Sequence, residues 1–262
     1  MRAGVVQFRP EFGDIKGNLK RLLSMIAAED ADLFVLPELA LSGYVFESRD
    51  EAMSLSQNPG GDEFRGVAAL AADKNATIVL GFAERAGDRL YNSSILVPPD
   101  GTVSVYRKVQ LFHNEKTIFD PGGRSPGVVE VAGVRLGMMI CFDWIFPEVA
   151  RTLALKGADV LCHPTNLVLP FCQDAMVTRC IENRVFAVTS NRVGTESRAG
   201  SEFTFTGRSQ VVAPKGEILT RAEVDGEGVF VVDIDPMLAR DKAVTETNDV
   251  LGDRRPELYE LG

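Results

Sequence analysis

The feature that most constrains the fold of this 262-residue chain is an order of strand and helix patterns that occurs twice. In the first half, apolar runs of strand length alternate with amphipathic helical segments, and a hairpin with a Pro-Pro-Asp-Gly turn closes the series. The same order, β-α-β-α-β-β-β, begins again at Val134. Alternating strands and helices in both halves predict an α/β fold.

The predicted elements of the first half are strands at 3–8, 32–36, 77–83, 91–97 and 102–107, with helices at 15–29 and 63–73. Asp14 is placed to cap the first helix, which carries leucines on one face. In the second half, strands are predicted at 134–140, 159–163, 185–190, 207–213, 217–221 and 228–234. One helix starts near Pro147 and stops at Gly157, and another spans 173–183.

Two short correspondences support a structural repeat. Ala-Asp-Leu-Phe-Val-Leu-Pro at 31–37 aligns with Ala-Asp-Val-Leu-Cys-His-Pro at 158–164, and the turn at 99–101 aligns with 214–216. Two sheets that are each covered by helices on one face can bury their other faces against each other. We therefore expect a four-layer αββα sandwich of two mixed β-sheets with pseudo-two-fold halves, in one domain over residues 1–247. Residues 248–262 carry little apolar periodicity and are expected to form a tail that packs on another surface.

Composition excludes several classes of protein. The net charge of −9 without any basic tract makes nucleic acid and anionic membranes poor partners. No window reaches the roughly 18 apolar residues of a membrane helix, and the first residues do not resemble a secretory signal. Four scattered cysteines and two histidines do not form a disulfide framework or a structural zinc site. We expect a cytoplasmic enzyme with reduced thiols and no metal.

One apparent nucleophile motif can be set aside, and no cofactor motif is present. The segment Gly-Arg-Ser-Pro-Gly at 123–127 matches G-x-S-x-G, but Pro126 has no N–H to offer an oxyanion and the segment runs into a strand. Ser125 is therefore predicted to be a loop residue. The chain contains no P-loop and no G-x-G-x-x-G, so no nucleotide cofactor is expected.

Three residues that follow predicted strands could carry chemistry. Cys141 comes at the exit of a strand and before a helix, where a thiol can gain reactivity from the helix dipole. A protonated thiol needs a base, and Glu38, flanked by apolar residues, would be partly desolvated and suited to that role. Lys108 could favour the thiolate and hold an oxyanion.

Each of these residues also has a plain structural interpretation. Cys141 could be a buried, inert cysteine, as we expect for the other three thiols. Glu38 and Lys108 could be solvated groups at the ends of strands. Because all three follow strands, one rim of a sheet could gather them, and only the tertiary structure decides whether it does.

Three blocks in this chain resemble the signatures of the nitrilase superfamily, the carbon–nitrogen hydrolases. They are Leu36-Pro37-Glu38, Tyr106-Arg107-Lys108 with the nearby Leu111-Phe112, and the octapeptide that begins at Cys141, and they occur in family order. The stretch 187–194 also resembles a family block. The similarity runs from Val5 to about Arg255 and is greatest to short, single-domain amidase-like and nitrilase-like members. It implies the αββα sandwich that the element order also predicts.

The resemblance assigns roles residue by residue. It implies Cys141 as nucleophile, Glu38 as general base and Lys108 as oxyanion stabiliser. Glu115 resembles the second glutamate of the family, which orients substrate and supports the lysine; its alternative is a surface charge pair with the following lysine. The backbone N–H of Phe142 would complete the oxyanion hole. The resemblance also implies a homodimer, with the tail packing on the partner subunit.

Departures from the family pattern bear on the substrate. Gln110 stands where many members have histidine. The continuation Phe-Asp-Trp after Cys141 is unlike the Trp-Glu or Gly-Glu of long nitrilases, which favours amides over nitriles. Candidate substrate-binding residues are Tyr44, Trp144, Asn166 and Phe142. The pocket shape would be set by the loops at 42–58 and 165–173.

The sequence thus predicts a cofactor-free hydrolase that releases ammonia and a carboxylic acid from a small amide or carbamoyl amide. The reaction would pass through a thioester on Cys141, and the ammonium of Lys108 would supply the positive charge that a metal supplies elsewhere. The first alternative is a nitrilase that forms a thioimidate on the same residues. The second is a non-catalytic scaffold with the same fold.

Overall fold

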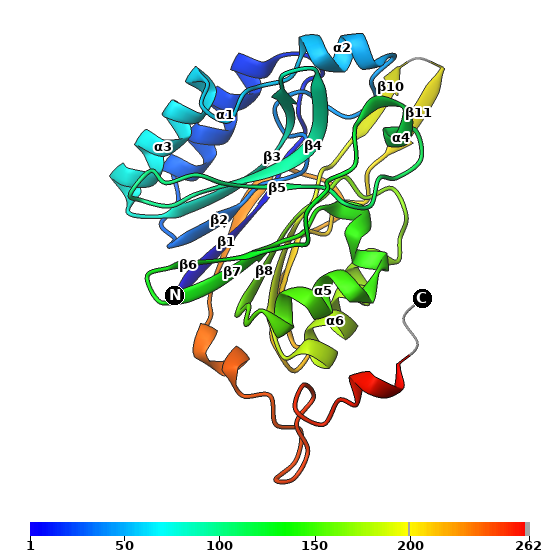
Figure 1. Cartoon of the computed structure of the whole chain (residues 1–262). Helices are drawn as coiled ribbons and strands as arrows, with labels where there is room; N and C mark the ends of the chain where they lie inside the picture. Colours follow the sequence, from blue (N-terminus) through cyan, green and yellow to red (C-terminus); the bar gives the residue numbers. More distant parts are fainter. Residues whose placement is uncertain (199, 260–262) are drawn as a thin grey trace.

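A computed structural model describes residues 1–198 and 200–259 and confirms the predicted four layers (Figure 1). Two six-stranded sheets pack face to face. Helices α1 (Ile15–Ala27) and α3 (Asp62–Lys74) cover the outer face of one sheet, and α5 (Pro147–Leu155) and α6 (Cys172–Asn183) cover the other. The repeated order in the sequence is therefore a repeat in space.

The two sheets share one topology. The first, in the order β14-β1-β2-β3-β4-β5, contains β14 (Gly228–Asp233), β1 (Arg2–Gln7), β2 (Leu33–Val35), β3 (Thr77–Ala86), β4 (Arg89–Val97) and β5 (Ser104–Arg107). The second, in the order β6-β7-β8-β9-β12-β13, contains β6 (Val128–Val131), β7 (Val134–Met138), β8 (Val160–Pro164), β9 (Phe186–Ser190), β12 (Gln210–Val212) and β13 (Ile218–Arg221). In each sheet three parallel strands lie between antiparallel neighbours.

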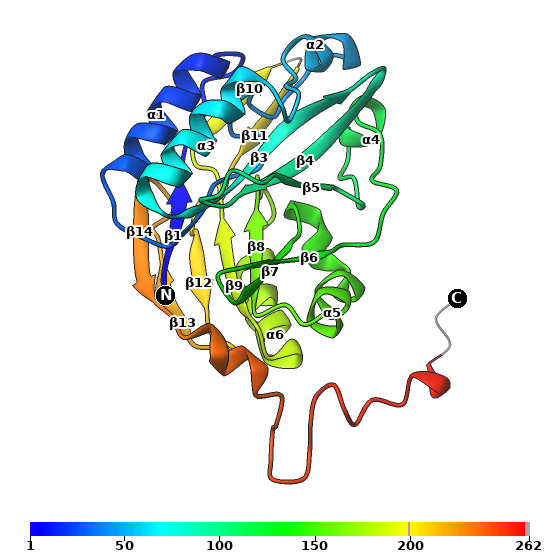
Figure 2. The same ribbon diagram turned by 60° about the vertical axis from the view of Figure 1, so that its left-hand side comes forward.

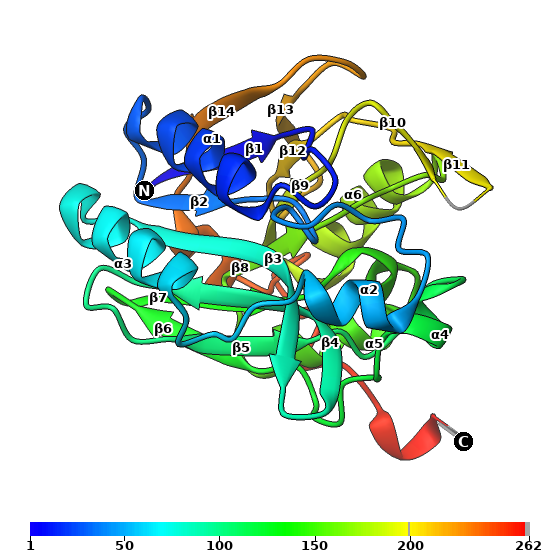
Figure 3. The ribbon, with the colours of Figure 1, turned by 90° about the horizontal axis from the view of Figure 1, so that it is seen from above.

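One strand lies in a different sheet from the one that its place in the chain suggests. The sequence places β14 at the end of the second half, but it pairs antiparallel with β1 of the first sheet (Figure 3). The corresponding edge of the second sheet is β6, which pairs antiparallel with β7. Local pattern predicts that a strand exists, whereas its partner is chosen by contacts between distant parts of the chain.

The short elements were not predicted. They are α2 (Arg49–Ser54), α4 (Glu115–Ile118), the hairpin of β10 (Thr195–Arg198) and β11 (Ser201–Thr204), and the 3₁₀ turns η1 (Cys141–Ile145), η2 (Pro236–Arg240) and η3 (Pro256–Leu258). The strand predicted over 134–140 ends at Met138, because η1 intervenes before α5. Elements of three to six residues are too short for periodicity to reveal.

Strands of the first sheet are buried on both faces. Val5 of β1 lies in the core between the sheets, whereas Val6 and Phe8 pack with Leu22 and Ile26 of α1. Such strands appear as continuous apolar runs rather than as alternating ones. The predicted cap of α1 is confirmed, since Asp14 accepts a hydrogen bond from the N–H of Gly17.

The turn that carries Glu38 is pressed against β3. The N–H of Gly81 donates to the carbonyl of Pro37 (3.1 Å), and the N–H of Ala40 donates to the carbonyl of Gly81 (3.0 Å). A Cβ atom at position 81 would lie 2.4 Å from the Cα of Glu38. Only glycine lets the two backbones approach this closely.

We expect Gly81→Ala to lower the free energy of unfolding by about 1–3 kcal/mol, because the Glu38 turn must move away from β3. Urea denaturation measures the effect. The matched control is Gly123→Ala, since a Cβ there meets no atom within 4 Å. Equal urea midpoints for the two variants would show that the turn accommodates the methyl group freely.

After η2 the chain leaves the sandwich, and the tail that carries η3 extends away from the two sheets (Figure 2). Leu258 and Tyr259 are exposed there. The predicted tail spans 248–262, of which residues 260–262 lie outside the described residues. Within the described residues, no helix has the length and apolar character needed to cross a bilayer.

Candidate active site

Three charged side chains meet in the interior beyond the ends of β2 and β5. The Lys108 Nζ donates to Glu38 Oε1 (2.7 Å) and to Glu115 Oε1 (2.8 Å). Lys108 and Glu38 are fully buried, and Glu115 is 4% exposed. Glu115 is therefore not half of a surface charge pair, and the structure brings together three of the predicted residues.

Glu38 is held so that one oxygen stays free. Its Oε1 also accepts from Asn92 Nδ2 (2.7 Å), and its backbone carbonyl accepts from Asn166 Nδ2 (2.9 Å). Its Oε2 is buried and has no hydrogen-bond partner. A buried carboxylate oxygen without a donor is costly, so this atom is oriented and available for a proton.

The charge on Lys108 is secured by its neighbours. Burial alone would lower the pKa of Lys108, but the Glu115 and Glu38 carboxylates outweigh burial and raise that pKa above its ordinary value. Burial raises the pKa of Glu115, while the Lys108 ammonium opposes the rise. The lysine therefore remains an ammonium at neutral pH.

Cys141 stands at the start of η1 with a φ of +40°, in the left-handed region. Beneath it, the His163 Nε2 lies 3.0 Å from the Cys141 carbonyl oxygen, and the Nδ1 lies 3.3 Å from Thr189 Oγ1. Burial lowers the pKa of His163 to about 4, so the ring is neutral. The histidine supports the backbone of the cysteine and does not contact its thiol as a base.

The thiol is not activated by its position alone. Burial and then the Glu38 carboxylate raise the pKa of Cys141, and the Lys108 ammonium only partly offsets them. A short 3₁₀ turn, rather than the predicted helix, directly follows the cysteine, and burial is the largest influence on the pKa of its thiol. A thiol of this kind needs a base to remove its proton.

Tyr44 is fixed from two directions. Its hydroxyl donates to Glu115 Oε1 (2.9 Å), and its ring packs edge-on against Phe203 and Phe205. The Glu196 carboxylate of β10 accepts from the backbone N–H of Tyr44 (3.2 Å) and is paired with Arg192. The β10–β11 hairpin thus orients a residue that reaches the charged cluster.

A small cavity of about 20 Å³ lies beside Cys141. Asn166 borders it together with the cysteine itself. The remaining walls are aromatic and aliphatic: Phe112, Phe142, Trp144, Leu167, Val168 and Leu169. Three of the four residues predicted to bind substrate therefore line this cavity, and the fourth, Tyr44, reaches the charged cluster through its hydrogen bond to Glu115.

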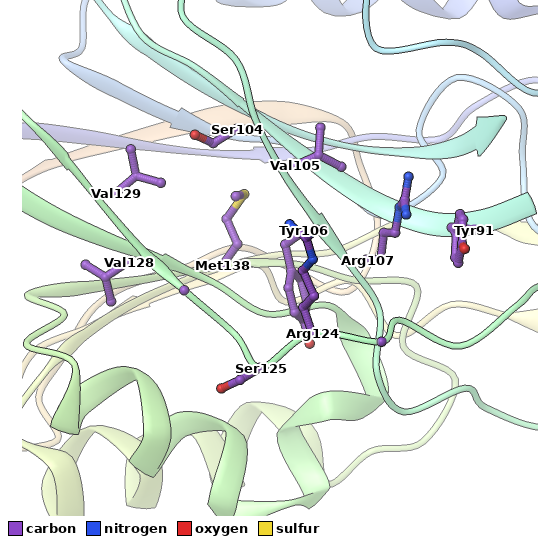
Figure 4. Close-up of a pocket in the computed structure, with 12 residues that line it drawn as sticks. Tyr91, Ser104, Val105, Tyr106, Arg107, Arg124, Ser125, Val128, Val129 and Met138 are labelled. Atoms are coloured by element: carbon purple, nitrogen blue, oxygen red, sulfur yellow. The ribbon is translucent and has the colours of Figure 1, made fainter. Parts of the chain in front are cut away.

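A much larger cavity of about 580 Å³ lies elsewhere, between β5 and β6 (Figure 4). Tyr106, Arg107, Val128 and Val129 line it, and none of the eight predicted site residues does. Ser125 also borders this cavity, and its hydroxyl accepts from the Lys156 ammonium. Ser125 is a loop residue, as predicted.

Sequence reasoning missed several residues that support the site. Asn92 and His163 sit inside predicted strands, where a polar residue was assigned no role, and Glu196 lies in the hairpin that was not predicted. The signal for Asn92 was the polar triplet Asn-Ser-Ser at 92–94 within an apolar strand, fully buried in the structure. Asp143 was noted only as part of the block after Cys141.

No metal site is evident in the part of the chain that the structure describes, 1–198 and 200–259. No group of three or more His, Cys, Asp or Glu side chains there is arranged to hold a metal ion. The positive charge at the site comes from the Lys108 ammonium.

Comparisons with known proteins identify the family of this chain. The family model described as carbon-nitrogen hydrolase matches residues 2–243. A nitrilase of Pyrococcus abyssi is 42% identical, over 99% of both chains, and an (R)-stereoselective amidase of Pseudomonas is 38% identical, over 97% of this chain and 92% of that one. A double mutant of an amidase from Nesterenkonia sp. AN1 in complex with acrylamide is 26% identical, with a TM-score of 0.81 over 98% of this chain and 95% of that one.

The model match covers most of the chain, and both curated relatives exceed 30% identity over nearly all of it. The four-layer fold is the fold of the matched amidase. This chain therefore belongs to the carbon–nitrogen hydrolases of the nitrilase superfamily and is a hydrolase of carbon–nitrogen bonds.

Proposed function

We propose that this protein is an amidase that cleaves a small amide through a thioester on Cys141. The observation that carries the proposal is the buried Oε2 of Glu38, which has no hydrogen-bond partner, on a carboxylate whose Oε1 is held by the Lys108 ammonium. The same carboxylate raises the pKa of the nearby Cys141 thiol. In this arrangement Glu38 is the general base, Lys108 stabilises the oxyanion and Glu115 holds Lys108 in place.

The cycle balances with these residues alone. Glu38 takes the thiol proton as sulfur attacks the amide carbon, and the Lys108 ammonium with the Phe142 N–H stabilises the oxyanion. Glu38 returns the proton to the leaving nitrogen, so that ammonia departs and a thioester remains. Glu38 then deprotonates a water molecule, which attacks the thioester and releases the carboxylic acid and the thiol.

The walls beside Cys141 favour an uncharged acyl group. They are aromatic or aliphatic apart from Asn166, and a charged substituent placed against them would lose its hydration without gaining a partner. The relative that holds acrylamide, a small neutral amide, supports the same substrate class. We therefore propose short, neutral aliphatic amides as substrates.

We expect ammonia release from butyramide to exceed that from succinamate and from 3-aminopropionamide by about 10–100-fold in kcat/KM, the size of an uncompensated polar burial of roughly 1–3 kcal/mol. The three amides have similar length and differ in the charge at the far end. A preference for either charged amide would contradict the neutral-pocket assignment while leaving the amidase activity in place.

The high identity to a nitrilase keeps a second candidate open. The same thiol and base can attack a nitrile to form a thioimidate. Release of acid from a dinitrile without free amide would favour this reaction. A scaffold without turnover would be indicated if intact-mass analysis found no acyl adduct on Cys141 across amides and nitriles.

We propose one hydrolase domain over residues 1–247 and a homodimer in which residues 248–262 pack on the partner subunit. Exposed apolar side chains on the outer helical layer and on the tail support this arrangement: Leu155, Phe171, Ile181, Leu258 and Tyr259. All four cysteines are free thiols, which suits the cytoplasmic location predicted from the sequence.

A further inference from the structure

One buried acid beside the site has no part in the proposed chemistry. Asp143 is fully buried, and its Oδ2 accepts from the Tyr106 hydroxyl (2.8 Å) and from the Ile140 N–H (2.9 Å). Its Oδ1 accepts from the Gln110 N–H (3.1 Å). All three donors are uncharged, so hydrogen bonds rather than a direct ion pair hold this carboxylate.

The donors come from the two segments that carry the reacting groups. Tyr106 and Gln110 lie two residues before and two residues after Lys108. Ile140 precedes Cys141, and Asp143 follows it by two residues. One carboxylate therefore joins the lysine segment to the cysteine segment.

The two segments also meet through the Phe112 and Phe142 rings, whose centroids are 5.0 Å apart, whereas the backbone hydrogen bonds of Lys108 lie within the first half. The Lys108 N–H donates to the Asn92 carbonyl (2.8 Å), and the Lys108 carbonyl accepts from the Gly122 N–H (2.8 Å). On the other side, the Cys141 carbonyl lies against His163, on a strand of the second sheet. Asp143 therefore connects, by hydrogen bonds, the segment around Lys108 with the turn that begins at Cys141. In a similar way, Asn166 connects the second half to the turn that carries Glu38.

We propose that Asp143 is a positioning residue that sets the separation between the Lys108 ammonium and the Cys141 sulfur. The inference rests on the proposed function, because the two groups must act on the two atoms of one carbonyl. Misplacement by about 1 Å typically costs about 100-fold in rate. The loss should fall on kcat, since the ammonium is needed most as charge develops on the oxygen.

The charge state of Asp143 gives this role a pH signature. Burial raises the pKa of Asp143 to about 6, while its three donors and the nearby Lys108 ammonium oppose the rise. The titratable groups that face it are the Tyr106 phenol and Lys108. Below that pH Asp143 would be protonated, and its O–H would face groups that themselves donate hydrogen bonds. The connection between the Lys108 and Cys141 segments would weaken, and activity would fall.

The test compares Asp143→Asn and Tyr106→Phe with a control, Asp159→Asn. Asp159 is another buried carboxylate. It immediately precedes β8 and forms ion pairs with Arg135 and Arg240, which are not part of the site. We would measure kcat, KM and the pH profile with a neutral amide. The rate of Cys141 alkylation by iodoacetamide, followed by peptide mass, would be measured in parallel.

Asp143→Asn is expected to lower kcat and the alkylation rate by about 10–100-fold with KM changed less than about threefold. Tyr106→Phe removes one donor from the carboxylate, so the acidic limb of the profile should move up by about 0.5–1 pH unit. Asp159→Asn should lower the melting temperature and leave kcat within about twofold.

The proposal is overturned if Asp143→Asn keeps the wild-type kcat and alkylation rate, or if Tyr106→Phe leaves the acidic limb in place. Should Asp143→Asn fail to fold, the Tyr106→Phe profile decides alone. If the wild-type protein is alkylated at Cys141 but releases no ammonia from amides, the proposed function is rejected. The positioning role of Asp143 would then be tested by comparing the alkylation rates of wild type and Asp143→Asn.

Discussion

Replacing Cys141 with alanine is expected to lower kcat for amide hydrolysis by about 10⁴-fold or more, because no other group in the cluster can form the acyl-enzyme. Cys141 is 5% exposed in a turn whose backbone is held by His163, so removing its sulfur should leave the fold intact. Ammonia release and circular dichroism would measure the two effects.

The control is Cys180→Ala. Cys180 is a fully buried thiol on α6, and burial alone raises its pKa. We expect this variant to keep wild-type kcat, and intact-mass analysis to find an acyl adduct in it but not in Cys141→Ala. Turnover that survived in Cys141→Ala would move the nucleophile to another residue and remove the basis of the proposed mechanism.

Replacing Lys108 with methionine should damage both activity and stability. Removal of an oxyanion donor typically costs about 10²–10³ in kcat. The Glu38 and Glu115 carboxylates would also lose their shared cation in a buried site, which costs roughly 3–5 kcal/mol of stability. Both losses follow from the two hydrogen bonds that the Lys108 ammonium donates at 2.7 and 2.8 Å.

The stability loss should depend on pH in a defined direction. The pKa of Glu115 is already raised by burial, and removal of the Lys108 ammonium would raise it further. A carboxyl group with a raised pKa in the folded state favours folding at low pH, and that contribution is lost as pH rises through the folded pKa. The melting temperature of Lys108→Met should therefore fall further below wild type at pH 8 than at pH 5.

The matched control is Lys116→Met, which removes an exposed ammonium next to Glu115. Surface substitutions of this kind usually change stability by no more than about 0.5 kcal/mol. If Lys108→Met were as stable as Lys116→Met at pH 8, the two carboxylates would not depend on the lysine for their burial.

The sequence predicted most helices and strands because caps, prolines, glycines and apolar periodicity act within a few residues of the element they define. Helix α1 begins at the predicted residue since Asp14 caps it, and α5 begins at Pro147, with Gly157 just beyond its end at a φ of +86°. The two halves follow from the doubled element order. The strand order could not be predicted in the same way, since β14 joins the first sheet through pairing with β1 more than 200 residues earlier.

In the candidate site, too, some residues could be predicted from the sequence and others could not. Glu38, Lys108 and Cys141 could be chosen from the sequence because each follows a strand and each stands in a block with a family resemblance. The roles of Asn92, His163 and Asp143 could not, because each acts through a hydrogen bond to a residue distant in the chain or in another segment.

By itself the sequence determined the chemical groups, the elements that carry them and the doubled α/β order, since these depend on residue type and short-range periodicity. The tertiary structure alone decided that burial raises the pKa of the thiol, that one oxygen of Glu38 is free and that Lys108 is held between two carboxylates. Those properties depend on burial and on distances between segments that only the packing of the two sheets establishes.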